Sequence, residues 1–221
     1  MKYDAILFDY DGTVADSLPD IVFSLNVAMR QYGLPEYDAE SLAPLLGYGA
    51  HVLMQRAVPP GTSDELREKL YRAYVDYYAA HANDRTVPYP GILPMMERLK
   101  ADGLKLAVIS NKPDAAVQPG AAKLFSGLLS LAVGERPEVR RKPWPDMVET
   151  AARDLGVALD RCLYVGDTEV DIDTARSAGI DCVCVTWGFR TREELQAAGG
   201  TVIIDTPEEL VKYVEDGSLN G

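Results

Sequence analysis

Histidine, cysteine and long apolar runs are all scarce in this chain. Its 221 residues include only three cysteines and two histidines. The odd cysteine count argues against a disulfide framework, and the short apolar runs around Cys162, Cys182 and Cys184 indicate buried strand residues rather than a metal site. A Ser-His-Asp or Cys-His mechanism would need His51 or His81, and no nucleophile motif lies beside either.

Basic residues are also few, with 22 Lys and Arg against 34 Asp and Glu. The net charge of −12 argues against nucleic acid or an anionic membrane surface as the main partner. No apolar run is long enough to span a bilayer, and the first residues, MKYDAILFDYDG, lack the basic, apolar and cleavage regions of a signal peptide. We therefore expect a cytoplasmic protein with no nucleic-acid or membrane partner.

Short apolar runs alternate with helical patterns over most of the chain. The predicted strands are Ala5–Phe8, Leu104–Ile109, Leu128–Val133, Cys162–Val165, Cys182–Val185 and, more weakly, Val202–Ile204. The helical patterns between them are Leu93–Ala101, Trp144–Leu155 and Asp171–Ala178. Runs that are apolar on both faces and separated by helices predict an α/β fold with a doubly wound parallel sheet.

One segment, 15–86, contains helical signals and no convincing strand. Ser17–Tyr32 predicts a helix ended by Gly33. Thr62 and Glu65 fit a capping box that opens a helix running to about residue 82. We expect an all-helical insert at 15–86 in a catalytic core of 1–14 and 87–221, with a hinge at the two crossings.

Three tyrosines recur on one face of the second of these helices. Tyr71, Tyr74 and Tyr78 follow one another at helical spacing. Aromatic stripes of this kind usually pack against neighbouring helices. We interpret these three as packing residues of the insert.

The first predicted strand ends in two carboxylates, in the sequence AILFDYDGT. Residues two apart in an extended segment point the same way, so Asp9 and Asp11 can face one site. Gly12 allows the backbone to turn sharply behind them. Ligands of open α/β sheets bind at the carboxyl ends of the strands, which is where this pair lies.

Other polar residues are predicted at the same edge of the sheet. The second strand runs into Ser110, Asn111 and Lys112, and the fourth into Asp167 and, one turn on, Asp171. The sequence RRKP supplies cations just before the helical pattern between these strands. Carboxylates, a hydroxyl and lysines therefore gather at one edge of one sheet.

This set of groups suits phosphoryl transfer. Clustered carboxylates repel each other, so a divalent cation is expected among them, and oxygen ligands suit Mg²⁺. One carboxylate can attack phosphorus while a second protonates the leaving oxygen and later takes a proton from water. A hydroxyl and a lysine can bind the charge that spreads over the phosphoryl oxygens.

The motifs resemble those of the haloacid dehalogenase superfamily, and within it the phosphoglycolate phosphatase-like branch. They are, in order, FDYDGTVADS, YPGI, VISNKP, RRKPWP, VGDTEVDIDTARSAG and VTWGFRTREEL. The resemblance covers nearly the whole chain. It implies a Rossmann-like core with an inserted helical cap that closes over small substrates.

The resemblance also implies roles for residues of the core. Asp9 is similar to the family's nucleophile and Asp11 to its general acid/base. Ser110, Asn111 and Lys142 would bind the transferring phosphoryl group. The Mg²⁺ ligands would be Asp9, the backbone carbonyl of Asp11 and Asp167, with Asp171 supporting through water or through Lys142.

In the cap, the resemblance points to the loop Leu46–His51 as the part that reaches the active site. Tyr48 and His51 are its only side chains with polar groups. They would contact the part of the substrate remote from phosphorus, or would only pack within the cap.

Departures within the superfamily narrow the reaction. Dehalogenases lack the second aspartate, which is present here as Asp11. Sugar-phosphate mutases carry a histidine soon after the first motif, where this chain reads ADSLPDIVFSLN, and phosphonate-cleaving relatives need a lysine where it reads LGYGAH. Hydrolysis of a phosphomonoester remains, with the substrate open among phosphoglycolate, pyrophosphate, sugar phosphates and nucleotides.

Two other classes of protein use related groups. A phospho-accepting signalling module also has strand-end carboxylates, a hydroxyl and a lysine, but it needs neither a helical insert nor a second aspartate. A catalytically silent binding protein would keep the fold, whereas here every catalytic position is filled. We expect an enzyme, monomeric or homodimeric, that acts on a small phosphorylated metabolite.

Overall fold

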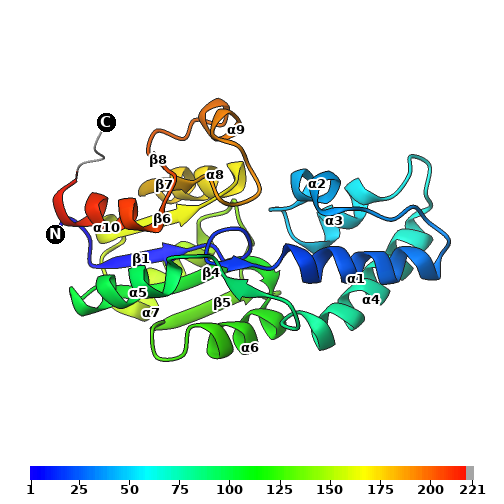
Figure 1. Cartoon of the computed structure of the whole chain (residues 1–221), viewed down its shortest axis with the longest axis horizontal. Helices are drawn as coiled ribbons and strands as arrows, with labels where there is room; N and C mark the ends of the chain where they lie inside the picture. Colours follow the sequence, from blue (N-terminus) through cyan, green and yellow to red (C-terminus); the bar gives the residue numbers. More distant parts are fainter. Residues whose placement is uncertain (218–221) are drawn as a thin grey trace.

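Six parallel strands form the central sheet of the computed structural model, which describes residues 1–217 (Figure 1). Their order across the sheet is β5-β4-β1-β6-β7-β8. The strands are β1 Ala5–Phe8, β4 Lys105–Pro113, β5 Leu131–Glu135, β6 Cys162–Gly166, β7 Asp181–Val185 and β8 Ile203–Ile204. The predicted α/β fold is confirmed. The third strand begins at Leu131 rather than Leu128, because Leu128 and Leu129 pack against the core before the ladder starts.

Alternate strand residues fill two separate hydrophobic layers. In β1, Ile6 and Phe8 belong to the layer that also contains apolar residues of α5 (Ile92–Ala101) and α10 (Pro207–Asp216). Ala5 and Leu7 belong to the opposite layer, with α7 (Asp146–Leu155) and α8 (Glu169–Ala178). Because both faces are covered, the strands are apolar throughout, and the polar residues are left to the strand ends.

Three further core helices within the described residues were not among those predicted. They are α6 (Asp114–Leu124), α9 (Arg192–Ala197) and α10. Pro119 lies inside α6, where it removes a backbone hydrogen bond and weakens the helical pattern. None of the helices within residues 1–217 is long and apolar enough to cross a membrane.

The insert is a helical cap with a hydrophobic core of its own. Its elements are α1 (Leu18–Gln31), α2 (Ala39–Leu42), the 3₁₀ turn η1 (Ala43–Leu45), α3 (Ala50–Ala57) and α4 (Asp64–His81). They lie to the right of the sheet in Figure 1. The chain enters the cap between β1 and α1 and leaves it between α4 and α5. Leu25, Met29, Leu42, Leu53 and Leu70 are buried together in this second core.

The two crossings between core and cap pair with each other. Ala15–Asp16 (β2) and Val87–Pro88 (β3) form a two-stranded antiparallel ribbon. The expectation of no strand at the start of the insert was therefore wrong for Ala15 and Asp16. Their partners in the ribbon lie more than seventy residues away along the chain. We keep the proposed division into a core of 1–14 and 87–221 and a cap of 15–86.

The residue that opens α4 differs from the sequence prediction. Ser63, not Thr62, is the N-cap, and its hydroxyl accepts a hydrogen bond from the Leu66 N–H at 3.2 Å. The Thr62 hydroxyl instead donates to the Pro59 carbonyl at 2.7 Å. Both residues can cap a helix. The Thr62 hydroxyl is already bonded within the turn at Pro59, and Ser63 is therefore the N-cap.

All three cysteines are free thiols in or at the start of strands. Cys162 and Cys184 are buried, and Cys182 is half-buried. The prediction of strand residues without a disulfide is confirmed. Burial raises the pKa of the Cys162 thiol to about 11, so this thiol is unreactive at neutral pH.

Candidate active site

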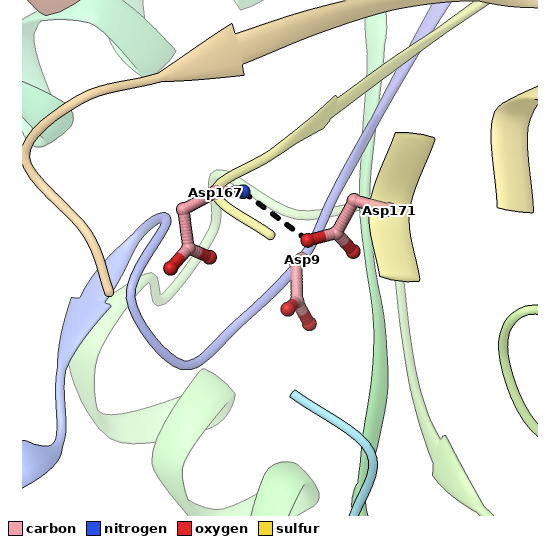
Figure 2. Close-up of side chains that lie close together, drawn as sticks. All are labelled: Asp9, Asp167 and Asp171. Carbon is pink, nitrogen blue, oxygen red and sulfur yellow. Dashed lines mark hydrogen bonds between the residues drawn. The ribbon is translucent and has the colours of Figure 1, made fainter. Parts of the chain in front are cut away.

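Three buried aspartates meet at the carboxyl edge of the sheet. Asp9 follows β1, Asp167 follows β6, and Asp171 lies in the first turn of α8 (Figure 2). One carboxylate oxygen from each lies within 4.8 Å of the others. The sheet register places β1 beside β6, with Phe8 opposite Val165, and so brings together carboxylates that are far apart in sequence.

Lys142 joins two of these carboxylates. Its Nζ lies 2.8 Å from Asp9 Oδ1 and 2.8 Å from Asp171 Oδ1, and its side chain is fully buried. Burial works against the charged form, but the two carboxylates outweigh it and raise the pKa of Lys142 well above its usual value. This lysine is therefore a permanent cation beside Asp9.

Asn111 fixes the backbone of Lys142. Its Oδ1 accepts the Lys142 N–H at 2.9 Å, and its Nδ2 donates to the Lys142 carbonyl at 3.1 Å. The same Nδ2 donates to the Gly47 carbonyl of the cap at 3.1 Å. The Asn111 side chain therefore positions both Lys142 and the cap loop.

Asp171 has both of its oxygens occupied by the protein. Oδ2 accepts from the Asp167 N–H at 3.2 Å, from the Thr168 N–H at 3.0 Å and from the Thr168 hydroxyl at 2.8 Å. Oδ1 accepts from Lys142 and, at 3.3 Å, from the Tyr164 hydroxyl. Its place in the cluster is therefore to orient the Asp167 loop and Lys142.

Asp167 is enclosed by backbone on two sides. Its carboxylate accepts the Thr13 hydroxyl and the Phe189 N–H, each at 2.8 Å. A Cβ at Gly12 would lie 2.3 Å from this carboxylate, and one at Gly188 would lie 2.4 Å from it. Only glycine fits at these two positions, and Gly12 also has a left-handed φ of +84°.

The electrostatics of the cluster show a shortage of positive charge. Burial, opposed by Lys142 and reinforced by Asp171, raises the pKa of Asp9 to about 7. Burial and the neighbouring Asp171 and Asp9 also raise the pKa of Asp167 well above its usual value. An all-oxygen donor set with unbalanced negative charge fits a hard divalent cation such as Mg²⁺.

Asp11 lies outside this cluster and has its own cation. Its Oδ1 accepts from Lys112 Nζ at 2.8 Å and from the Ser17 hydroxyl. The Lys112 ammonium lies 4.9 Å from the centre of the Tyr10 ring and 4.8 Å from that of Tyr78, and it also donates to the Tyr78 hydroxyl. The sequence places Lys112 at the strand end but gives no signal for this pairing.

A cavity of about 60 Å³ lies between the strand ends and the cap. On the core side it is lined by Asp9, Asp11, Ser110, Asn111 and Lys112. On the cap side it is lined mainly by apolar groups, including Ile21, Leu46, Ala50 and Leu53, and by the tyrosines Tyr74 and Tyr78. The interpretation of these two tyrosines as packing residues was incomplete, because they face the cavity as well as the cap core.

The cap loop meets the cavity through its backbone. Gly47 and Gly49 line the cavity, whereas Tyr48 and His51 are not among its lining residues. The Tyr48 ring stacks against the Arg56 guanidinium at 4.3 Å, and the His51 ring stacks on Tyr71 with centroids 3.8 Å apart. Tyr48 and His51, which lies in the first turn of α3, therefore pack within the cap, and the proposed contact of these two side chains with the substrate stays a prediction.

The fold and the site define an α/β protein with a helical insert, in which buried carboxylates and a lysine meet at one edge of the sheet. A family model described as haloacid dehalogenase-like hydrolase matches residues 6–185. The chain belongs to this family, and its relatives make it a phosphoric monoester hydrolase. The family resemblance inferred from the motifs is confirmed.

Several relatives of similar length carry one name. A phosphoglycolate phosphatase of Aquifex aeolicus is 32% identical, with 96% of each chain covered. Another, from Colwellia psychrerythraea, is 31% identical over 94% of this chain and 95% of its own. A crystal structure of a candidate phosphoglycolate phosphatase from Lactobacillus delbrueckii subsp. bulgaricus superposes with a TM-score of 0.93 at 38% identity, covering 97% of this chain and 99% of that one.

Proposed function

We propose that this protein is a Mg²⁺-dependent phosphatase that hydrolyses a small phosphomonoester through a phospho-aspartate on Asp9. The observation that carries the proposal is the contact of Lys142 Nζ with Asp9 Oδ1 at 2.8 Å, beside Asp167 and Asp171. A nucleophilic carboxylate needs a neighbouring cation to receive a dianionic phosphoryl group, and Lys142 supplies one.

Asp9 is held in position for attack on phosphorus. Its Oδ1 accepts the Tyr10 N–H at 2.7 Å in addition to Lys142, while Oδ2 has no hydrogen bond to any residue in the described part of the chain. An oxygen of Asp9 forms the new bond to phosphorus as the bond to the leaving oxygen breaks. Ser110, in the second half of β4 and in the cavity wall, binds a phosphoryl oxygen together with Lys142.

Asp11 moves the protons. In the first step it gives its proton to the leaving oxygen, which departs as an alcohol. In the second step it takes a proton from the water that attacks phosphorus, so that inorganic phosphate leaves and Asp9 is regenerated. Its place in the cavity wall, apart from the three-aspartate cluster, suits contact with the leaving group rather than with the metal.

Asp9 and Asp167 would hold the metal, with the Asp11 carbonyl as a third ligand. Mg²⁺ bound there would neutralise charge on the phosphoryl oxygens. Asp171 would act indirectly, since hydrogen bonds already occupy its two oxygens.

Phosphoglycolate is the first substrate to test. The supporting facts are the names of full-length relatives and the small volume of the cavity. A water molecule needs at least roughly 10–15 Å³ of such space, so a cavity of about 60 Å³ suits a small phosphorylated molecule. The cap tyrosines and Lys112 would contact that molecule.

The proposal is tested with a panel of phosphorylated metabolites. Purified protein stripped of metal is assayed for phosphate release from phosphoglycolate, pyrophosphate, sugar phosphates, nucleotides and a phosphopeptide, with and without Mg²⁺. We expect multiple turnovers on a small phosphomonoester only with Mg²⁺. A single stoichiometric phosphorylation without turnover would instead indicate a signalling module, and full activity in excess chelator would contradict the metal site.

A further inference from the structure

Arg190 is a buried arginine of the core whose side chain reaches the cap. It lies between β7 and α9 and is only 7% exposed. Its guanidinium donates from Nε to Glu169 Oε2 at 2.8 Å and from Nη2 to Glu169 Oε1 at 3.0 Å. This bidentate pair fixes the plane of the guanidinium, so its remaining donors have a defined direction.

The guanidinium also donates to two backbone carbonyls of the cap and, at 3.5 Å, to the Phe189 carbonyl beside it. Nη1 donates to the Ala43 carbonyl at 3.2 Å, and Nη2 also donates to the Leu46 carbonyl at 3.0 Å. These carbonyls stand at the two ends of the turn η1, just before the cavity-lining Leu46–Gly49 segment. One side chain of the core therefore holds the start of the cap loop.

We propose that Arg190 is a positioning residue. It fixes the turn η1 and the start of the cap loop Leu46–His51 over the phosphoryl site, and Glu169 orients its guanidinium. Lys in its place would carry the charge but could not make the same planar set of hydrogen bonds. Nothing in the proposed reaction requires Arg190 to touch the substrate, and it is not among the residues that line the cavity.

The neighbouring residues connect this contact to the metal site. Phe189 donates its N–H to Asp167, and its ring lines the cavity and packs against the cap core. Glu169 follows Asp167 by two residues and also interacts with the Tyr48 hydroxyl of the cap loop. The segment 43–48 therefore contacts both residues 188–190, which include the Phe189 N–H bonded to Asp167, and Glu169, two residues after Asp167.

A second residue of the core, Asn111, donates to the Gly47 carbonyl. Gly47 follows Leu46 in the chain, whereas Ala43 precedes it. The segment is therefore held to the core through the carbonyls of Ala43, Leu46 and Gly47 and through the Tyr48 side chain. Loss of the two contacts made by Arg190 leaves those made by Asn111 and Glu169.

The direct test measures hydrogen exchange of the cap loop by mass spectrometry, without substrate or metal. The variants are Arg190→Met, which removes all donors, Arg190→Lys and Glu169→Gln. The matched control is Arg192→Met. Arg192 lies two residues on, is half-exposed, and pairs with Asp205 at 2.8 Å and with the Ile203 carbonyl rather than with the cap. Peptides from strand β1 serve as an internal reference for global opening.

We expect the amides of 43–53 to exchange about tenfold faster in Arg190→Met, by an intermediate factor in Arg190→Lys and Glu169→Gln, and at the wild-type rate in Arg192→Met. The β1 peptides should not change. Unchanged exchange of 43–53 in Arg190→Met, or equal acceleration in β1, would overturn the proposal. If Arg190→Met does not fold, Arg190→Lys and Glu169→Gln decide by the same criteria.

A kinetic test rests on the proposed function and follows the exchange test. On the best small phosphomonoester, Arg190→Met should raise KM and lower kcat/KM about tenfold, with Arg190→Lys between it and the wild type. An unchanged kcat/KM would overturn the role in positioning. If no phosphomonoester is hydrolysed by the wild type, the proposed function fails, while the exchange experiment still decides whether Arg190 holds the loop.

Discussion

Lys112 Nζ lies 2.8 Å from Asp11 Oδ1, so Asp11 has a cationic partner of its own beside the three-aspartate cluster. Lys142 is shared by Asp9 and Asp171, so each of the two buried lysines serves its own carboxylates. Two aspartates only two residues apart therefore have different cationic partners, Lys142 for Asp9 and Lys112 for Asp11.

Lys112→Met should reduce turnover mainly for substrates that need protonation of the leaving oxygen. The ammonium orients the Asp11 carboxylate, and methionine of similar length removes that contact. We expect kcat for an alkyl phosphate to fall by roughly 10–100-fold, with a smaller fall for p-nitrophenyl phosphate. Lys123→Met, an exposed lysine that donates to the Asn83 carbonyl, is the control and should retain both activities. Equal losses on both substrates in Lys112→Met would contradict this role.

Asp9→Asn should keep the fold and abolish turnover, because an amide cannot attack phosphorus. A loss of about four orders of magnitude or more in kcat is expected for removal of a nucleophile. Phosphate release and thermal melting are measured on the same preparation. Wild-type kcat in a folded Asp9→Asn protein would exclude covalent catalysis through Asp9.

Asp11→Asn should separate the acid role from the nucleophilic role. A good leaving group departs without a proton, whereas an alkoxide does not. We expect Asp11→Asn to lose more activity on an alkyl phosphate than on p-nitrophenyl phosphate, when both are measured as kcat at saturating Mg²⁺. The prediction fails if both substrates lose the same factor.

The stability of the metal-free protein should fall as the pH rises. Burial raises the pKa of Asp9 from its unfolded value of 3.8 to about 7, so between these values the folded chain binds more protons than the unfolded chain. The free energy of unfolding therefore decreases as pH increases through this window, and Asp167 acts in the same direction.

Thermal melting in excess chelator, from about pH 5 to about pH 8, checks this sign. We expect Tm to fall across the range in the wild type and to fall less in Asp9→Asn. Mg²⁺ should raise Tm of the wild type most at the upper end, because it supplies the missing positive charge. A metal-free Tm that rises steadily with pH would be the opposite of the expected result.

Ser63→Ala should destabilise the cap, because Ser63 caps α4 through the Leu66 N–H. The expected cost is about 1 kcal/mol in the free energy of unfolding. Thr62→Ala is the matched control: its hydroxyl bonds the Pro59 carbonyl at an exposed turn, so its loss should cost less. Denaturant unfolding of both variants gives the two free energies. A larger loss of stability in Thr62→Ala than in Ser63→Ala would indicate that Thr62 is the N-cap.

The sequence by itself determined the sheet and the edge at which the site lies. Strands covered on both faces must be apolar along their length, so their runs and the polar residues that end them are visible in one dimension. Asp9, Ser110 and Asp167 each follow such a run, and the carboxyl ends of parallel strands meet at one edge. Local order in the chain was enough to predict that these three residues share a site.

Only the tertiary structure decided which group pairs with which. Lys112 could have served the phosphoryl group instead of Asp11, and nothing around Arg190 in the sequence indicates two carbonyls of a cap loop that lies more than 140 residues earlier. Pairings of this kind depend on distances of a few ångströms between segments brought together by packing. The energy of a buried ion pair or hydrogen bond depends on those distances and on the exclusion of water, and neither is encoded in the local pattern of residues.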